Sequence, residues 1–270
     1  MDKKIAFIGA GNMAEAMVKG LITSGLVAAK DITVSDVSAH RLLHMKMTYE
    51  VGALTDNVKA VKGKDIIVVA VKPQVLDAAL KDIASTVTAK QLVVSIAAGV
   101  TVARIEACLG RKPRVIRVMP NTPSLVQEGA AAMFVGAGCK VGDSELAETL
   151  LGAVCKVVSK VSDERLMDAV TGLSGSGPAY VFLILEAMSD AGVRVGLPRD
   201  IAARLAAQTL LGSAKMALET GEPLCKLKDM VTSPGGTTIA GLQKLEDGAV
   251  RAAIYAAVEA ATNRSKELGG

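Results

Sequence analysis

Aromatic residues are scarce in this chain of 270 residues, which contains three Phe, three Tyr and no Trp. Half of the residues are nevertheless apolar, so the core must be built from Ala, Val, Leu, Ile and Met. Proteins that bind single-stranded nucleic acids stack the bases on aromatic side chains, and few are present here. The formal net charge of +4 is also small for this length and argues against a clustered basic face. We therefore expect no nucleic-acid partner.

Cysteine pairs and long apolar runs are missing as well. The four cysteines are widely spaced and form no CxxC pair, which predicts free thiols rather than a zinc site or a disulfide framework. No apolar run reaches the ~18 residues that a membrane span needs, and the N-terminus MDKKIAFIG enters a strand at once. These absences predict a cytoplasmic protein without a membrane partner. The length suits one large domain or two modest ones.

Histidine is equally rare, and the two histidines lie one helical turn apart. The i, i+4 spacing of His40 and His44 could bind a metal, but no third ligand is visible nearby. We therefore expect a solvated helix face at this place and no metal site.

A glycine-rich motif follows the first apolar segment. Ile5–Ile8 is typical of a short strand, and Gly9–Ala14 (GAGNMA) matches G-x-G-x-x-A before a helical stretch that ends near Ser24. Glycines at these positions permit a tight turn and a close approach of a pyrophosphate, which then faces the helix N-terminus. The strand, motif and helix together predict a dinucleotide cofactor.

The next predicted strand, Ile32–Ser35, ends at Asp36. An acid at this place bonds the 2′-hydroxyl of the adenosine ribose and disfavours a 2′-phosphate. Ser35, Ser38 and Arg41 lie close by and could instead serve a phosphate, and Asp36 could equally cap the following helix. The sequence leaves NADPH and NADH both open.

Three further strands are predicted, at Asp65–Val71, Leu92–Ser95 and Val115–Val118. The first is a continuous apolar run, as found in strands buried on both faces of a parallel sheet. Parallel sheets bind ligands at the carboxyl ends of their strands, where this chain has Lys72 and Asn121. Lys72 could contact cofactor or substrate or be a solvated strand end, and Asn121 could orient a nicotinamide amide or cap a turn. The alternation of strands and helices predicts a doubly wound α/β domain over residues 1–161.

The second half, residues 162–270, contains no convincing strand. Its predicted helices, rich in Ala and Leu, are Asp163–Gly172, Ala179–Gly192, Asp200–Thr220, Thr238–Leu245 and Asp247–Glu267. Apolar positions cover more than one face of Ala179–Met188 and of Ile201–Leu211. A helix of this kind must be covered on several sides, which predicts a large subunit interface.

Two segments of this half place small residues at a helix start. Leu173–Pro178 reads LSGSGP, and Ser233–Thr238 reads SPGGTT with Pro234 expected in the first helical turn. Free N–H groups and the positive end of the helix dipole favour a small anion, such as a carboxylate or a phosphate. An ordinary cap or close helix packing is the alternative at both places.

These motifs together resemble the pyrroline-5-carboxylate reductase family. They are GAGNMA at 9–14, AVKPQ at 70–74, SIAAGVT at 95–101, RVMPNTP at 117–123, AVTGLSGSGPAY at 169–180 and LKDMVTSPGGTT at 227–238. The resemblance covers nearly the whole chain, and the last two motifs are specific to the family. It implies an N-terminal Rossmann domain with a doubly wound parallel sheet, followed by an all-α dimerisation domain. It also implies a homodimer that interlocks through this domain, and many members assemble further into decamers of five dimers.

The resemblance implies hydride transfer from NADPH or NADH to the C=N bond of 1-pyrroline-5-carboxylate, giving L-proline in the last step of proline biosynthesis. Because an imine is basic enough to enter protonated, this reaction needs no additional strong acid, and none is visible near the motifs. The resemblance, together with the strand end at Ser35 and Asp36, implies cofactor contacts at Ile8, Gly9, Ala10, Gly11, Asn12, Met13, Ser35, Asp36, Asn57, Ala70, Val71, Lys72, Pro73, Ile96, Ala97 and Ala98.

The substrate residues expected from the resemblance are Ser174, Gly175, Ser176, Gly177, Pro178, Ser233, Gly235, Gly236, Thr237 and Thr238. Our hypothesis is that backbone N–H groups of Ser233–Thr237 bind the carboxylate while the Thr238 hydroxyl contacts the ring nitrogen. Thr238 and Lys72 are the candidate catalytic residues. The chain departs from many relatives after Glu222, where it reads Pro-Leu instead of His-Pro, so a substrate role for Glu222 stays open.

Two other functions were weighed against these motifs. β-Hydroxyacid dehydrogenases place a catalytic Lys and an Asn after a similar glycine pattern, but this chain has Val181 and Leu185 there. A cofactor-binding sensor without turnover is the other alternative, and the intact SPGGTT segment argues against it.

Overall fold

A single sheet dominates the first part of the computed structural model, which describes residues 1–110 and 113–269. Its strand order is β3-β2-β1-β4-β5-β6-β7-β8 within the described residues. The strands are β1 (Ile5–Ile8), β2 (Ile32–Ser35), β3 (Gly52–Leu54), β4 (Ile66–Val69), β5 (Leu92–Ser95), β6 (Arg114–Pro120), β7 (Gly129–Val135) and β8 (Cys155–Lys160).

The sheet is parallel except where β7 runs antiparallel to β6. Strand β1 lies between β2 and β4, with Ile5 opposite both Ile32 and Ile66, so the strand order reverses at β1. This is the switch point at which doubly wound sheets bind nucleotides. The N-terminal doubly wound α/β fold expected from the sequence is thereby confirmed, with one antiparallel pairing near its edge.

Three strands were not individually predicted from the sequence: β3, β7 and β8. Strand β3 has three residues, none of them buried. Strand β7 (GAAAMFV) begins with small residues, and β8 (CKVVSK) has exposed lysines at two positions. Neither carries the continuous run of β-branched residues that identifies β4 and β5. Strand β7 lies between β6 and β8 but is rich in alanine, and β8 forms the edge of the sheet.

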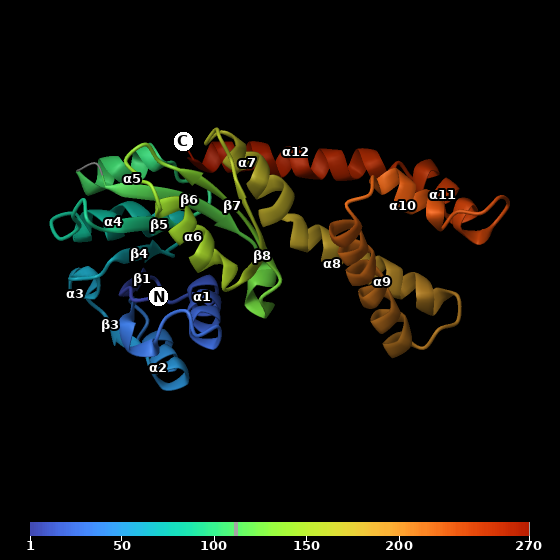
Figure 1. The fold of residues 1–270 in the computed structure, drawn as a ribbon. Helices are drawn as coiled ribbons and strands as arrows, with labels where there is room; N and C mark the ends of the chain where they lie inside the picture. The colour runs from blue at the N-terminus through green and yellow to red at the C-terminus, as the bar shows by residue number, and fades with distance from the viewer. Residues whose placement is uncertain (111–112, 270) are drawn as a thin grey trace. The chain divides into compact units, whose positions relative to one another are not determined.

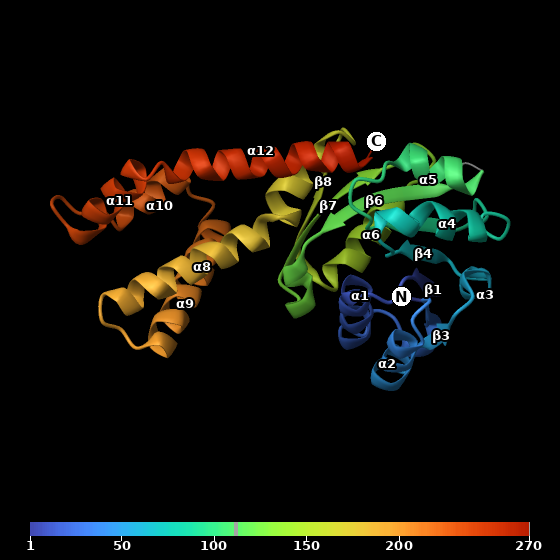
Figure 2. The same ribbon diagram turned by 180° about the vertical axis from the view of Figure 1, so that it is seen from behind.

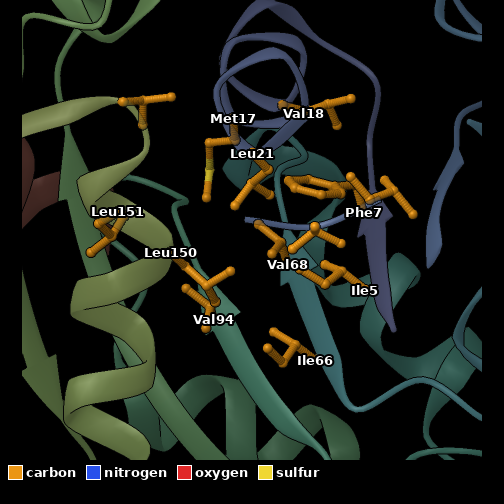
Figure 3. Close-up of a cluster of buried hydrophobic side chains, with 14 of the residues drawn as sticks. Ile5, Phe7, Met17, Val18, Leu21, Ile66, Val68, Val94, Leu150 and Leu151 are labelled. Carbon is orange, nitrogen blue, oxygen red and sulfur yellow. The ribbon is translucent and has the colours of Figure 1, made fainter. Parts of the chain in front are cut away.

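Helices cover both faces of the sheet, as Figures 1 and 2 show. One face packs against α1 (Asn12–Thr23), α2 (Ala39–Tyr49) and α6 (Asp143–Gly152), and the other against α3 (Asn57–Val61), α4 (Pro73–Ile83) and α5 (Val102–Leu109). Figure 3 shows the first layer, in which Met17 and Leu21 of α1 lie over Phe7 of β1 and Val68 of β4. The core is aliphatic, as the composition predicted.

No strand follows Lys160 in the described part of the chain, as expected. The helices there are α7 (Leu166–Val170), α8 (Gly177–Arg194), α9 (Arg199–Thr220), α10 (Leu224–Met230), α11 (Thr237–Asp247) and α12 (Val250–Gly269), and a π-helical turn, η3 (Thr171–Gly175), joins α7 to α8. Short 3-10 turns occur earlier, at η1 (Ala29–Asp31) and η2 (Thr122–Val126). The sequence missed α10, whose seven residues are too few for a clear periodicity.

The chain divides into two compact units, which we call the sheet unit (Met1–Ser176 with Ala260–Gly270) and the helical unit (Gly177–Glu259). In the helical unit, the buried apolar side chains among the described residues are Ala202 and Ala206 of α9. Large apolar residues such as Phe182, Leu183 and Leu205 are exposed there. The division of the chain into domains 1–161 and 162–270 stays a prediction.

Among the described residues, no helix is both long and apolar enough to cross a membrane. The same part of the chain contains no group of three His, Cys, Asp or Glu residues that could hold a metal ion.

Candidate active site

The glycine-rich loop after β1 contains two glycines with different surroundings. Gly9 has a φ of +100°, its N–H donates to the Ser35 carbonyl at 2.7 Å, and a Cβ atom here would lie 2.6 Å from the Ala70 carbonyl oxygen. Gly11 precedes α1 as its N-cap with a φ of −71°, and an added Cβ would meet nothing within 4 Å. Gly9 therefore lets the loop pass between β2 and β4, whereas Gly11 leaves open space at the N-terminus of α1.

Two adjoining cavities lie along the carboxyl ends of the strands. The larger, of about 590 Å³, is bordered by the ends of β1 and β2 and by α4. The smaller, of about 350 Å³, is bordered by the start of α1 and the ends of β5 and β6. Both are lined by Gly11 and by Ala70–Lys72 after β4. Two connected cavities around a helix N-terminus fit the two nucleotide halves of NAD(P)H with its pyrophosphate at Gly11.

The predicted cofactor residues come together in these cavities. All of them except Ala10 line one cavity or the other: Ile8, Gly9, Gly11, Asn12, Met13, Ser35, Asp36, Asn57, Ala70, Val71, Lys72, Pro73, Ile96, Ala97 and Ala98. Their contacts with a cofactor stay predictions. The sequence did not single out Asp82 and Met119, which also line the cavities. Met119 could have been found from its place at the end of β6, but Asp82 gave no signal because it lies late in α4.

Ala10 is fully buried, and side chains of the protein occupy both of its backbone polar groups. Its N–H donates to Asp36 Oδ2 at 2.8 Å, and its carbonyl accepts from Arg41 Nε at 2.7 Å. The second Asp36 oxygen accepts from the Ser38 N–H at 2.8 Å. Asp36 is therefore not the N-cap of α2, a role that the Ser38 side chain fills by accepting from the Arg41 N–H. The Ser38 hydroxyl therefore caps α2, and Arg41 supports the glycine-rich loop.

The carboxylate of Glu15 on α1 has three partners from α2. It lies 2.5 Å from Arg41 Nη2 and 2.7 Å from His44 Nε2, and it accepts a hydrogen bond from the Tyr49 hydroxyl at 3.0 Å. Burial by itself would raise the pKa of Glu15, but these hydrogen bonds outweigh it and lower the pKa to about 2. The solvated helix face expected at the histidines is correct for His40, which is exposed, and wrong for half-buried His44.

A chain of hydrogen bonds fixes Asn57 at the larger cavity. The buried Ser35 hydroxyl donates to Asn57 Oδ1 at 2.8 Å, and Asn57 Nδ2 donates to Asp82 Oδ2 at 3.2 Å. Because Ser35 is the donor, the amide oxygen of Asn57 points toward the sheet and its amino group toward Asp82. The orientation of the amide is thus set by β2 and α4 together.

Asn121 connects the end of β6 to the LSGSGP segment. Its Oδ1 accepts from the Ala130 N–H at 2.8 Å, and its Nδ2 donates to the Ser174 hydroxyl at 3.3 Å. The turn-cap alternative is wrong, since Asn121 makes no side-chain cap bond to η2. Gly175 lines the smaller cavity, where an added Cβ would lie 2.3 Å from the terminal methyl of Met119. The structure therefore brings Gly175, a predicted substrate residue, to the cavity that contains Ile96–Ala98.

Lys72 is the N-cap residue of α4 and makes no side-chain cap hydrogen bond. It lines both cavities, and Pro73 after it forms the first turn of the helix. This position between the two cavities is where a cation could contact either half of a dinucleotide or a substrate beside it.

The SPGGTT segment belongs to the helical unit and forms a tight turn before α11. The Gly236 N–H donates to the Ser233 carbonyl at 3.0 Å, and Gly235 has a φ of +65°, as a type II turn requires after proline. A helix does begin inside the segment, at Thr237. The placement of Pro234 in the first helical turn is wrong, because the turn delays the helix by three residues. Gly236 caps α11 without any side-chain hydrogen bond.

Glu222 lies just before α10 and accepts a hydrogen bond from Lys226 at 2.7 Å on the surface of the helical unit. Ser176, Gly177 and Pro178 mark the passage from η3 into α8 and are half-buried. The substrate contacts expected of these residues stay predictions.

Comparison with known proteins agrees with this architecture. A family described as "NADP oxidoreductase coenzyme F420-dependent" matches residues 4–99, and one described as "Pyrroline-5-carboxylate reductase dimerisation" matches residues 164–268. The chain is 46% identical over 268 residues to a pyrroline-5-carboxylate reductase of Methanosarcina acetivorans, covering 99% of this chain and 98% of that protein.

Solved structures give the same result. A pyrroline-5-carboxylate reductase from Coxiella burnetii superposes with a TM-score of 0.94 at 40% identity, covering 100% of both chains. The pyrroline carboxylate reductase of Plasmodium falciparum, solved with NADP bound, superposes with a TM-score of 0.89 at 31% identity, covering 100% of this chain and 99% of the other.

Proposed function

This chain belongs to the pyrroline-5-carboxylate reductase family, and from that premise we propose how its residues share the reaction. The enzyme is an NAD(P)-dependent oxidoreductase that reduces the C=N bond of 1-pyrroline-5-carboxylate to give L-proline, the last step of proline biosynthesis. When bound, the nicotinamide supplies the hydride. Because the imine enters protonated, the protein is left with binding and orienting the two partners.

The single observation that carries the proposed site is the pair of adjoining cavities meeting at Gly11. Residues 1–161 hold the cofactor there, with the pyrophosphate at the open N-terminus of α1. Ile96–Ala98 provide an apolar surface against which the flat nicotinamide ring lies, beside Asn121. Lys72 lies between the cavities and contacts the substrate or the cofactor from there.

Residues 162–270 hold the substrate. The N-terminus of α11 is uncapped by any side chain and is preceded by a glycine turn, which supports carboxylate binding by backbone N–H groups of Ser233–Thr237. The Thr238 hydroxyl, on the first turn of α11, contacts the ring nitrogen. Ser174–Pro178 contact the ring from the side of the smaller cavity, as the position of Gly175 supports.

The assembly is a homodimer built through the helical domain, and a decamer of five dimers is the larger form. The match of residues 164–268 to a dimerisation family and the exposed apolar side chains of α8 and α9 support this. In the dimer, SPGGTT of one subunit completes the site of its neighbour. The four free cysteines support a cytoplasmic location, and we expect neither a nucleic-acid nor a membrane partner.

Thr238→Ala tests the substrate site. We expect kcat/KM for 1-pyrroline-5-carboxylate to fall roughly 10- to 100-fold while the Kd for the reduced cofactor stays within about twofold, since only a substrate contact is lost. Thr149→Ala is the matched control, because Thr149 is exposed and its hydroxyl donates to the Glu145 carbonyl within α6. Turnover of Thr238→Ala at the wild-type rate would contradict the proposed contact between this hydroxyl and the substrate.

Site sharing between subunits has a separate test. Gly11→Val should block cofactor binding in one domain, and Thr238→Ala should weaken the substrate site in the other. If a site draws on two subunits, subunit exchange between the two impaired proteins restores wild-type sites at about a quarter of the active sites. Mixtures that stay as inactive as their components would show that each subunit holds its own complete site.

A further inference from the structure

The larger cavity, which by the proposed function receives the adenosine half of the cofactor, has an unusual set of charged residues. Among the described residues, Asp36 at the end of β2 and Asp82 of α4 place two carboxylates in its lining, against one cation, Lys72. Within the same part of the chain, Asp82 is bonded only to the Asn57 amide, which is neutral. Lys72 also lines the smaller cavity, so it is shared between both halves of the site. The lining is therefore net negative where an adenosine ribose would bind.

Asp36 retains acceptor capacity toward this cavity. Its two oxygens each accept one backbone N–H, from Ala10 and Ser38, out of the roughly four lone-pair positions of a carboxylate. The remaining positions suit the hydroxyl groups of an unmodified ribose, which donate hydrogen bonds. A 2′-phosphate has no proton to donate at neutral pH and would meet this carboxylate as a like charge.

Apart from Lys72, the cation and the hydroxyls near Asp36 that could offset that repulsion already have partners: Arg41, Ser38 and Ser35. Arg41 uses Nε for the Ala10 carbonyl and Nη2 for Glu15, and 27% of its side chain is exposed. Glu15 is in turn fixed by His44 and Tyr49. The Ser38 hydroxyl caps α2, and the Ser35 hydroxyl donates to Asn57. Turning Arg41 toward a phosphate would break its ion pair with Glu15 and its bond to the glycine-rich loop together.

We infer that this chain selects NADH over NADPH, with Asp36 as the specificity-determining residue and with Glu15 holding Arg41 away from a 2′-phosphate. Two features separated in sequence carry this inference: the carboxylates in the cavity lining and the four-residue cluster of Glu15, Arg41, His44 and Tyr49. Neither feature is required for hydride transfer itself. The selection acts through binding of the ribose, on the side of the cofactor away from the substrate.

Steady-state kinetics with each cofactor and calorimetric binding of two fragments test the inference. The fragments are ADP-ribose and 2′-phospho-ADP-ribose, whose binding does not depend on turnover. We expect the wild-type enzyme to favour NADH over NADPH, and ADP-ribose over its 2′-phosphate, by roughly 10- to 100-fold. Equal affinity for both fragments, or a preference for the phosphorylated one, would overturn the inference.

The variants separate the two parts of the mechanism. Glu15→Gln frees Arg41 and should reduce the preference for NADH over NADPH about tenfold, because the affinity for NADPH rises. Asp82→Asn should reduce the same preference by a smaller factor. Asp36→Asn should reduce the preference for NADH most. Because this substitution also weakens the hydrogen bond to the Ala10 N–H, the inference is tested on Glu15→Gln and Asp82→Asn. Glu148→Gln removes the same charge from the exposed surface of α6 and should leave the ratio unchanged. An unchanged ratio in both Glu15→Gln and Asp82→Asn would contradict the assignment.

The outcome also distinguishes this inference from the proposed function. Turnover with NADPH preferred contradicts the selectivity and leaves the reductase function intact. Absence of turnover with both cofactors contradicts the proposed site, and the fragment affinities then still decide the selectivity of the cavity.

Discussion

The sheet unit and the helical unit bury their apolar residues to very different extents. In the sheet unit, β1, β4 and β5 are buried along their whole length, with helices packed on both faces. In the helical unit, α8 and α9 leave residues such as Phe182, Leu183 and Leu205 exposed. A parallel sheet can enclose its core within one chain, whereas helices that are apolar on several faces need a further surface to cover them. The sheet unit therefore completes its core within one chain, whereas α8 and α9 present apolar side chains for an assembly.

Leu205→Glu is expected to have the largest effect, because it places a charge on the apolar surface of α9. Leu205 is 54% exposed in the single chain and lies beside Ile201 and Leu211. Burying an unpaired carboxylate in a dimer interface should weaken association by about 4 kcal/mol, roughly a thousandfold. Analytical ultracentrifugation would then show a monomer. Val141→Glu, at a fully exposed apolar residue of the sheet unit, is the control and should not change association. If Leu205→Glu remained dimeric, the apolar surface of α9 would not be part of the subunit interface.

Gly9→Ala should destabilise the sheet unit by about 3 kcal/mol, through its φ of +100° and the approach of the new methyl group to the Ala70 carbonyl. For a unit of this size, that corresponds to a fall in Tm of roughly 6–12 °C, measured by calorimetry.

Gly11→Ala is the matched variant two residues away. Since a Cβ here meets no atom within 4 Å, stability should change by less than about 0.5 kcal/mol. The new methyl group would occupy the space at the N-terminus of α1, and the Kd for the reduced cofactor should rise about 100-fold. If Gly9→Ala and Gly11→Ala lost similar stability, Gly11 would be packed as closely as Gly9 and would not border open space.

Acid should destabilise the sheet unit through Glu15. Its pKa is lowered from 4.5 when unfolded to about 2 when folded, so the ionised form is the one that folding stabilises. The stabilisation, about 3 kcal/mol at most, is complete above pH 4.5 and is lost as the pH falls through about 2. The free energy of unfolding, measured with urea, should fall as the pH falls through this range, and Glu15→Gln should remove this dependence on pH. Asp247→Asn removes an exposed carboxylate of the helical unit, whose pKa is lowered by hydrogen bonds from Lys244 and Gln243. It should change the pH dependence much less, because solvent screens this pair.

Ser265→Ala should have the smallest effect and tests whether the end of α12 is part of the sheet unit. The buried Ser265 hydroxyl donates to Asp168 Oδ1 at 2.7 Å, and this carboxylate also lies 3.6 Å from buried Arg117. Loss of one such bond costs about 1 kcal/mol, which denaturant titration can resolve. Ser213→Ala on the exposed surface of α9 is the control. Equal stability in the two variants would mean that the end of α12 does not stabilise the sheet unit.

The strands at the centre of the sheet could be predicted because their signals are local. Ile5–Ile8, Ile32–Ser35 and Leu92–Ser95 were placed correctly from apolar runs that end at small or polar residues. Strands β7 and β8 could not be placed, since β7 pairs with β6 and β8 pairs with β7, and neither pairing can be seen in the composition of the strands themselves. The start of α11 was found to within a turn, and the error at Pro234 arose from a β-turn that the motif alone does not distinguish from a helix.

By itself, the sequence determined that a doubly wound sheet precedes a helical part, where the dinucleotide motif lies, and many of the residues that line the two cavities. Glycine conformation and apolar periodicity act over a few residues, so they can be seen in the chain itself. The tertiary structure decided how the side chains around those cavities are used. Asp36 and Arg41 reach back 26 and 31 residues to hold Ala10, and Asn121 meets Ser174 across 53 residues. Such pairs form only when distant segments pack together, because a hydrogen bond depends on where both partners lie in space.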